Sequence, residues 1–143
     1  MNNILFAMIM GHFVGDYLFQ PLWMAKRKTE KSNTGAFICE FHALIYTVTV
    51  CLSMFQAWNV PFLYFVFVCF VSHYLIDRYS IGNLWLKLIK GRFINKNTMN
   101  QSITWKRQTY DVAFSSIVYV VVDNTLHILI MWRMLDLLGI ING

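Results

Sequence analysis

Residues 61–77 read Pro61-Phe-Leu-Tyr-Phe-Val-Phe-Val-Cys-Phe-Val-Ser-His73-Tyr-Leu-Ile-Asp77, an apolar run without Lys or Arg. An α-helix needs roughly 17 to 25 such residues to cross the hydrocarbon core of a bilayer. Three similar runs occupy residues 3–20, 36–57 and 112–138. The sequence therefore predicts an all-α, polytopic membrane protein with about four transmembrane helices.

The composition of the 143-residue chain fits a surface that faces lipid. Hydrophobic residues make up 57% of the chain and charged residues 13%, whereas a typical soluble domain is about 25% charged. A chain of this length forms one domain, so we expect a single membrane-embedded helical domain over residues 1–143. No Lys or Arg precedes the first apolar run, so we expect this run to remain in the mature protein.

Basic residues gather in two segments between the apolar runs, at residues 26–31 and 87–107. The turn near Asn59 carries no charge. The positive-inside rule therefore predicts a bacterial cytoplasmic (inner) membrane protein with both basic segments in the cytoplasm and both termini outside. We attribute the net charge of +5 to this asymmetry and to contact with anionic lipid headgroups of the bilayer, and expect no nucleic-acid partner.

The polar region at residues 78–111 contains apolar residues between its basic ones. The apolar residues are Leu84, Trp85, Leu86, Leu88, Ile89, Phe93 and Ile94, and the basic ones are Lys87, Lys90, Arg92 and Lys96. This pattern is typical of an interfacial amphipathic helix in the headgroup plane, with a solvated loop as the alternative. The limit of the last span is open, because Arg133 and Asp136 either end it or lie at an interface.

Four histidines lie in or at the ends of the apolar runs, and three of them have a carboxylate four residues away. The pairs are His12 with Asp16, His73 with Asp77 and, in reverse order, Asp123 with His127. Residues four apart share one face of a helix, so each of these helices offers an imidazole and a carboxylate to one place. His42 adds a fourth imidazole from the second run.

Burying these carboxylates requires a compensating interaction. An Asp at the centre of a membrane helix costs roughly 2.5 to 3.5 kcal/mol on insertion scales. Arg78 and Arg133 stand only at run ends, so protonation, carboxylate–imidazole hydrogen bonds or a divalent metal remain. A metal satisfies neutral imidazoles and ionised carboxylates together. We therefore predict a metal cluster whose ligands are His12, Asp16, His42, His73, Asp77, Asp123 and His127.

Zinc suits a His/Asp ligand set best, and manganese or iron fits where carboxylates are numerous. Seven candidate ligands leave room for two ions. A proton or ion pathway and plain interhelical polar contacts are the competing interpretations of the same residues. Glu40 stands about 200° round a helix from His42 and is expected to face the interface instead.

Four separated motifs follow one another along nearly the whole chain. They are His12-Phe-Val-Gly-Asp16-Tyr-Leu-Phe-Gln20 with Trp23-Met-Ala-Lys26, His42-Ala-Leu-Ile-Tyr46, His73-Tyr-Leu-Ile-Asp77 and Asp123-Asn-Thr-Leu-His127. In this order they resemble a small membrane family of bacteria and their phages, catalogued as domain of unknown function 3307. Asn124 stands where that family usually has Gln, which weakens a specific role for this amide. A looser similarity links the His-x-x-x-Asp helices to membrane-bound metal-dependent hydrolases, as an analogy between site patterns.

The leading hypothesis is a membrane-embedded metal-dependent hydrolase. It would act on a phosphoester or lipid-like substrate reached from the cytoplasmic side. Gln20, Lys26 and Asn124 are expected to support the ligands or to contact the substrate. A proton or cation transporter or channel is the first alternative, and a non-catalytic interaction protein of a phage or bacterial envelope is the second. The sequence leaves the oligomeric state open.

Overall fold

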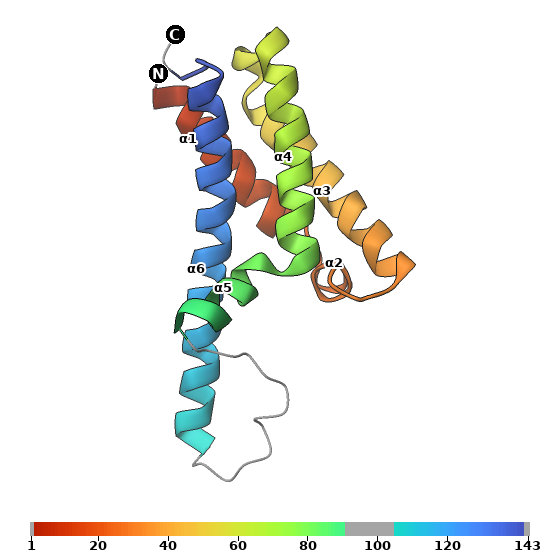
Figure 1. Ribbon diagram of the computed structural model, residues 1–143, viewed down its shortest axis with the longest axis vertical. Coiled ribbons are helices and arrows are strands. Elements are labelled where there is room, and N and C mark those ends of the chain that lie inside the picture. Colours follow the sequence, from red (N-terminus) through yellow and green to blue (C-terminus); the bar gives the residue numbers. More distant parts are fainter. Residues whose placement is uncertain (1, 91–104, 142–143) are drawn as a thin grey trace.

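The computed structural model describes residues 2–90 and 105–141, and the regular elements within these residues are all helical (Figure 1). In chain order they are α1 (Asn2–Phe13), the π-helical turn η1 (Val14–Leu18), α2 (Leu22–Arg27), α3 (Asn33–Ser53), the 3₁₀ turn η2 (Phe55–Ala57), α4 (Val60–Tyr79), α5 (Ile81–Lys90) and α6 (Trp105–Leu137). The predicted all-α class is confirmed over this part of the chain.

Local sequence signals account for where the central helices begin. The side chain of Ser32 accepts a hydrogen bond from the amide of Gly35 at the start of α3. The side chain of Asn59 does the same for Phe62 at the start of α4, where Pro61 occupies the first turn. These caps satisfy amide groups that have no partner inside the helix. The turn expected near Asn59 is therefore confirmed.

Three helical stretches are long and apolar enough to cross a membrane: Asn33–Ser53 of α3, Pro61–Tyr79 of α4 and Ala113–Leu137 of α6. The first apolar stretch, Asn3–Leu18, is shorter. At about 1.5 Å per residue it extends about 24 Å, somewhat less than the roughly 30 Å thickness of a hydrocarbon core.

The four longest elements form a closed bundle. Helix α1 packs against α3, α3 against α4, α4 against α6, and α6 again touches α1. Both ends of the described chain lie at one end of the bundle, and α2 and α5 lie toward the other (Figure 1). The core near the termini is apolar and includes Met8, Val50, Phe65, Met131 and Leu135. The polar residues of the apolar runs lie closer to α2 and α5.

Two glycines let the first helix approach α3 closely. A Cβ atom on Gly11 would lie 2.9 Å from the Cα of Val50, and one on Gly15 would lie 3.2 Å from the Cα of Tyr46. Small residues four apart are a recurrent device for packing membrane helices backbone to backbone. The pair Gly11 and Gly15 therefore sets the distance between the helices that carry His12 and His42.

Helices α5 and α6 differ from the expected segments in where they begin. Helix α5 begins immediately after α4, at the left-handed residue Ser80 (φ 49°, ψ 50°), and buries Leu86 while Leu88 is exposed. A helix rather than a loop is thus present at residues 81–90, and its place at a headgroup surface remains a prediction. The expected continuation through Arg92, Phe93, Ile94 and Lys96 lies outside the described residues. Helix α6 begins at Trp105, before residue 112, and Arg133 pairs with Asp136 near its end.

Candidate metal centre

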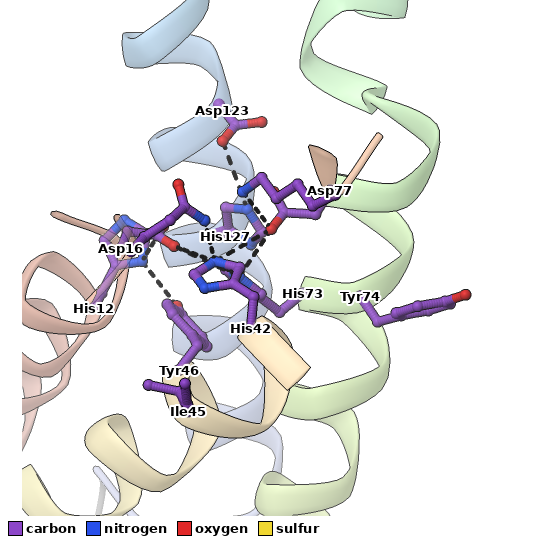
Figure 2. A network of polar contacts seen from close by, with 12 residues as sticks. His12, Asp16, His42, Ile45, Tyr46, His73, Tyr74, Asp77, Asp123 and His127 are labelled. Atoms are coloured by element: carbon purple, nitrogen blue, oxygen red, sulfur yellow. Dashed lines mark hydrogen bonds and ion pairs between the residues drawn. The ribbon is translucent and has the colours of Figure 1, made fainter. Parts of the chain in front are cut away.

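The four bundle helices bring the imidazoles and carboxylates of the apolar runs into one region (Figure 2). All four histidine residues are 0–2% exposed. The carboxylates differ, because the side chain of Asp77 is 2% exposed whereas those of Asp16 and Asp123 are 12% and 17% exposed. The centre is therefore closed on its histidine side and partly open near Asp16 and Asp123.

Four ligand-type atoms lie close together at the middle of this region. The Nε2 atoms of His42 and His73 are 3.0 Å apart. Oδ1 of Asp16 lies 3.2 Å from the first of these nitrogens and 3.5 Å from the second. Oδ2 of Asp77 lies 3.4 Å from the first and 3.1 Å from the second. The two imidazoles therefore face two carboxylates across one small space.

These separations fit a tetrahedral ion. Ligands with bonds of about 2.0–2.1 Å to a central zinc ion are about 3.3–3.4 Å apart when they occupy the corners of a tetrahedron. Five of the six edges of such a tetrahedron, all except the one between Asp16 and Asp77, run from 3.0 to 3.5 Å and bracket that value. Separations of this size also fit hydrogen bonds. Whether the site needs an ion therefore depends on how many protons the side chains can donate to its acceptor atoms.

Protons are too few for the lone pairs in this space. The Nε2 of Gln20 lies 2.6 Å from Nε2 of His42; an amide nitrogen donates, so this ring nitrogen accepts. The other donors are Nε2 of His73, 3.1 Å from Oδ2 of Asp77, and Nζ of Lys28, 2.6 Å from the same oxygen. The ionised carboxylates of Asp16 and Asp77 add only acceptors. A cation is the group that satisfies such an excess of lone pairs. Gln20, expected to support the ligands, contacts His42 at the same nitrogen that an ion would use, so binding of the ion requires this amide to move aside.

The π-helical turn η1 explains how Asp16 reaches the middle of the site. The amide of Phe19 donates to the carbonyl of Val14, five residues earlier. This wider turn changes the angle between Asp16 and His12 from that of an α-helix. The carboxylate remains 3.6 Å from Nδ1 of His12 through one oxygen while its other oxygen faces His42. The sequence does not signal this turn.

His12 lies in the same region but is engaged by other side chains. Its Nε2 donates to Oδ1 of Asn124, at 2.6 Å, and its Nδ1 accepts from the hydroxyl of Tyr46, at 2.8 Å. The amide nitrogen of Asn124 in turn donates to the hydroxyl of Tyr17. Asn124 therefore has a defined role: it ties α6 to α1 through His12.

Tyr46 is a site residue that the spacing of histidines and carboxylates does not reveal. Its ring stacks on that of His73, with centroids 3.6 Å apart and planes 15° apart. A metal-binding histidine usually donates its other ring N–H to an acceptor, but Nδ1 of His42 and of His73 have no such partner among the described residues. Packing against Tyr46 holds the ring of His73 instead.

A second group of ligands adjoins the first. One ligand atom each from Asp77, Asp123 and His127 lies within 4.8 Å of the other two. The ring of His127 is 4.3 Å from that of His73, centroid to centroid. Asp123 and His127 of α6 therefore lie beside the central carboxylate Asp77 and not in the apolar half of the bundle.

Lys28 is the second residue that the sequence did not single out. Its Nζ donates to Oδ2 of Asp77 at 2.6 Å. The segment that carries it is tied down by Arg78, whose guanidinium donates to the carbonyls of Lys28 and Glu30. Lys26, expected at the site, is exposed on α2, and so is Glu40 on α3. Lys28 thus brings the basic charge that was expected from Lys26.

The family model described as "Protein of unknown function (DUF3307)" matches residues 4–139. The chain belongs to this family. The matched residues include every ligand of the candidate centre, so the resemblance carried by the four motifs is confirmed. No curated protein and no solved structure matches. Membership in DUF3307 names no reaction, so the function is argued from the site.

Proposed function

We propose that the chain is a membrane-embedded, metal-dependent hydrolase that holds a divalent ion, zinc in the first place, between its helices. The observation that carries this proposal is the set of separations of 3.0 to 3.5 Å that join the Nε2 atoms of His42 and His73 to each other and to the carboxylates of Asp16 and Asp77. Two imidazoles and two carboxylates are a ligand set that zinc accepts, and manganese or iron fits as well.

Charge balance supports one ion at the centre. Asp16, Asp77 and Asp123 together contribute three negative charges when ionised, and Lys28 contributes one positive charge. A divalent ion brings the sum to zero, which is the condition for burying charged groups at low cost. Without the ion, two carboxylates would lack a compensating charge.

The roles of the chain's own residues follow from their positions. His42, His73, Asp16 and Asp77 would hold the ion, which supplies Lewis-acid activation of water and of a phosphoryl or carbonyl oxygen. Lys28 is 13% exposed and lies at the partly open side of the centre, so it would attract an anionic substrate. Tyr46 would hold the imidazole of His73 in place by stacking on it. A phosphoester or a lipid-like ester is the substrate class that this arrangement suits.

We further propose four membrane spans, with α2 and α5 on the cytoplasmic side of a bacterial inner membrane and both termini outside. The common location of the two ends of the described chain supports an even number of crossings (Figure 1). Lys26, Arg27 and Lys28 lie at the end where α2 and α5 lie, in agreement with the positive-inside rule. The shorter first stretch would span by local thinning of the bilayer.

A cation or proton pathway is less well supported. Such a path needs polar side chains along the whole thickness of the bundle. The part of the core nearer the termini is filled by apolar residues, including Met54, Phe62 and Leu135. Asp123 and His127, which could have continued a path, lie beside Asp77 instead.

Metal analysis and thermal melts of the detergent-solubilised protein test the proposal. We expect bound metal in the wild type and a lower melting temperature after chelation, because an ion at about a thousand times its Kd adds about 4 kcal/mol to stability. His73→Ala should carry no ion at the central position and respond little to chelator, while the exposed control Glu40→Gln should behave as the wild type. A wild type without metal, and indifferent to chelator, would lead us to abandon this function.

The hydrolase part needs its own measurement. Cleavage of a chromogenic phosphate ester by the metal-loaded wild type should disappear in His73→Ala and persist in Glu40→Gln. Metal binding without turnover of phosphate or carboxylic esters would reduce the proposal to a metal-binding membrane protein.

A further inference from the structure

We propose that Asp77, Asp123 and His127 form a second divalent-cation site, and that the carboxylate of Asp77 bridges it to the first. This inference rests on the proposed function, because Asp77 is also a ligand of the central ion. It assigns Asp123 and His127, which do not bind the central ion, to a second ion.

Two polar atoms of this group, one on His127 and one on Asp123, lack hydrogen bonds among the described residues. Nε2 of His127 has no hydrogen-bond partner in the described chain, although the residue is only 2% exposed. Its nearest carboxylate contact, Oδ2 of Asp123, is 3.7 Å away, too far for a hydrogen bond. Oδ1 of Asp123 is buried and equally without a partner among these residues. Buried polar groups are normally satisfied, so a buried imidazole and a buried carboxylate oxygen beside each other point to a ligand.

The chemistry and spacing of the group select a cation. One ligand atom from each of the three residues lies within 4.8 Å of the others, close enough to share one ion after small rotations of the side chains. An imidazole nitrogen and two carboxylates are donors that zinc, manganese and iron accept. A hydrogen-bond donor such as water would leave the charge of Asp123 uncompensated.

Asp77 connects the two sites. Its Oδ2 atom lies 3.1 Å from Nε2 of His73 in the first site, and the same carboxylate belongs to the group with Asp123 and His127. A carboxylate has two oxygens and can bind one ion with each. Two-metal hydrolytic sites hold their ions about 3.5–4 Å apart, and the neighbouring rings of His73 and His127, 4.3 Å between centroids, can serve one ion each.

A close approach of α5 keeps Asp123 in place. A Cβ atom on Gly82 would meet Oδ1 of Asp123 at 3.0 Å and Cε2 of Tyr119 at 3.3 Å. Glycine at this position therefore allows the first turn of α5 to lie against the carboxylate without displacing it. The second site is formed by α4 and α6, with α5 closing one side.

The charge of a two-ion centre specifies the kind of substrate. Two divalent ions and Lys28 contribute five positive charges, and Asp16, Asp77 and Asp123 contribute three negative ones. The excess of two positive charges matches a dianionic phosphate monoester, or inorganic phosphate as its product. Occupancy of the second site should therefore rise when phosphate is bound.

Manganese binding by the full chain in detergent tests the second site. Equilibrium dialysis should give two Mn²⁺ ions per chain for the wild type with phosphate present, and two for the control Glu40→Gln. His127→Ala and the isosteric Asp123→Asn should each bind one. Electron paramagnetic resonance should show a spin-coupled pair in the wild type and an isolated ion in both variants. Omitting phosphate should weaken binding of the second ion at least tenfold.

The outcomes separate this inference from the proposed function. One ion in the wild type and in both variants would overturn the second site and leave the central ion standing. No ion in the wild type would remove the proposed function as well. Two ions that persist in both variants would show that the ligands are other residues, and two uncoupled ions would rule out the Asp77 bridge. An affinity indifferent to phosphate would overturn the charge argument for a phosphate monoester.

Discussion

At the scale of single residues, Lys28 and Lys26 offer the sharpest contrast. Both belong to the same basic segment, but Lys28 forms an ion pair with buried Asp77 while Lys26 is exposed on α2. Removing one partner of a buried ion pair leaves the other charge uncompensated, at a cost of about 3–5 kcal/mol. The two lysines therefore form a matched pair for mutation.

Lys28→Met should lower the melting temperature strongly in the presence of chelator, because Asp77 then has neither the ammonium nor an ion. Saturating metal should restore most of this loss. Lys26→Met should have little effect in either condition, as for most exposed substitutions. Thermal melts in detergent measure both variants, and equal melting temperatures of the two in chelator would contradict the pairing described.

His12→Ala separates hydrogen bonding from metal binding. Because both ring nitrogens of His12 are engaged by Tyr46 and Asn124, we expect a stability loss of about 1–2 kcal/mol from the two interhelical hydrogen bonds. The number of bound ions should not change. Denaturation in mixed micelles and metal analysis provide the two measurements, and loss of an ion would make His12 a ligand after all.

The sequence predicted that these imidazoles and carboxylates come together, but not the partner of each side chain. The spacing of His73 and Asp77 is enough to predict that the two side chains lie together, because the helical period places residues four apart on one face. Helical spacing does not identify Lys28 or Tyr46. Lys28 belongs to a segment with several basic residues, and Tyr46 is one aromatic residue among many. Only their contacts in the folded bundle, with Asp77 and with His73, distinguish these two residues from others of their type.

At the scale of the elements, the contact between the first helix and α3 depends on Gly11 and Gly15. Gly15→Ala places a methyl group within 2.9 Å of Cδ2 of Tyr46, so the ring that stacks on His73 has to move. We expect a destabilisation of about 1–3 kcal/mol, as for other overpacked contacts, and weaker metal binding. Phe13→Ala, at an exposed position at the end of the adjoining α1, is the control for both measurements. Metal affinity unchanged in Gly15→Ala would show that Tyr46 does not position the site.

The helices themselves were predictable from the sequence where apolar runs are long and capped. The segments around Asn59 and Ser32 illustrate this, since a capping side chain stands at each helix start. The π turn at Val14–Leu18 was not predictable, because its residues carry no local pattern that distinguishes it from the α-helix before it. The early start of α6 lies in a polar segment without apolar periodicity.

At the scale of the whole molecule, the proposed topology can be tested with a matched pair of cysteines. Lys31→Cys lies at the α2 end and Gln56→Cys in η2 at the opposite end, and both positions are exposed. The native cysteines Cys39, Cys51 and Cys69 are buried and contribute little background. A membrane-impermeant maleimide added to intact cells should label Gln56→Cys and leave Lys31→Cys unlabelled. The reverse pattern would invert the topology.

Asp77 stands in the last turn of α4, and its backbone carbonyl accepts a hydrogen bond from Ser80 at 3.2 Å as the helix ends. The C-terminus of a helix carries a partial negative charge of about half an electron, which opposes a carboxylate there by about 0.3–1 kcal/mol or more when partly buried. The aligned peptide dipoles of α4 thus repel the side chain that the centre depends on. Their field acts in the same direction as the carboxylate itself, drawing cations toward this end of the helix. The backbone of α4 therefore adds to the affinity of the site for positive charge, independently of any side chain.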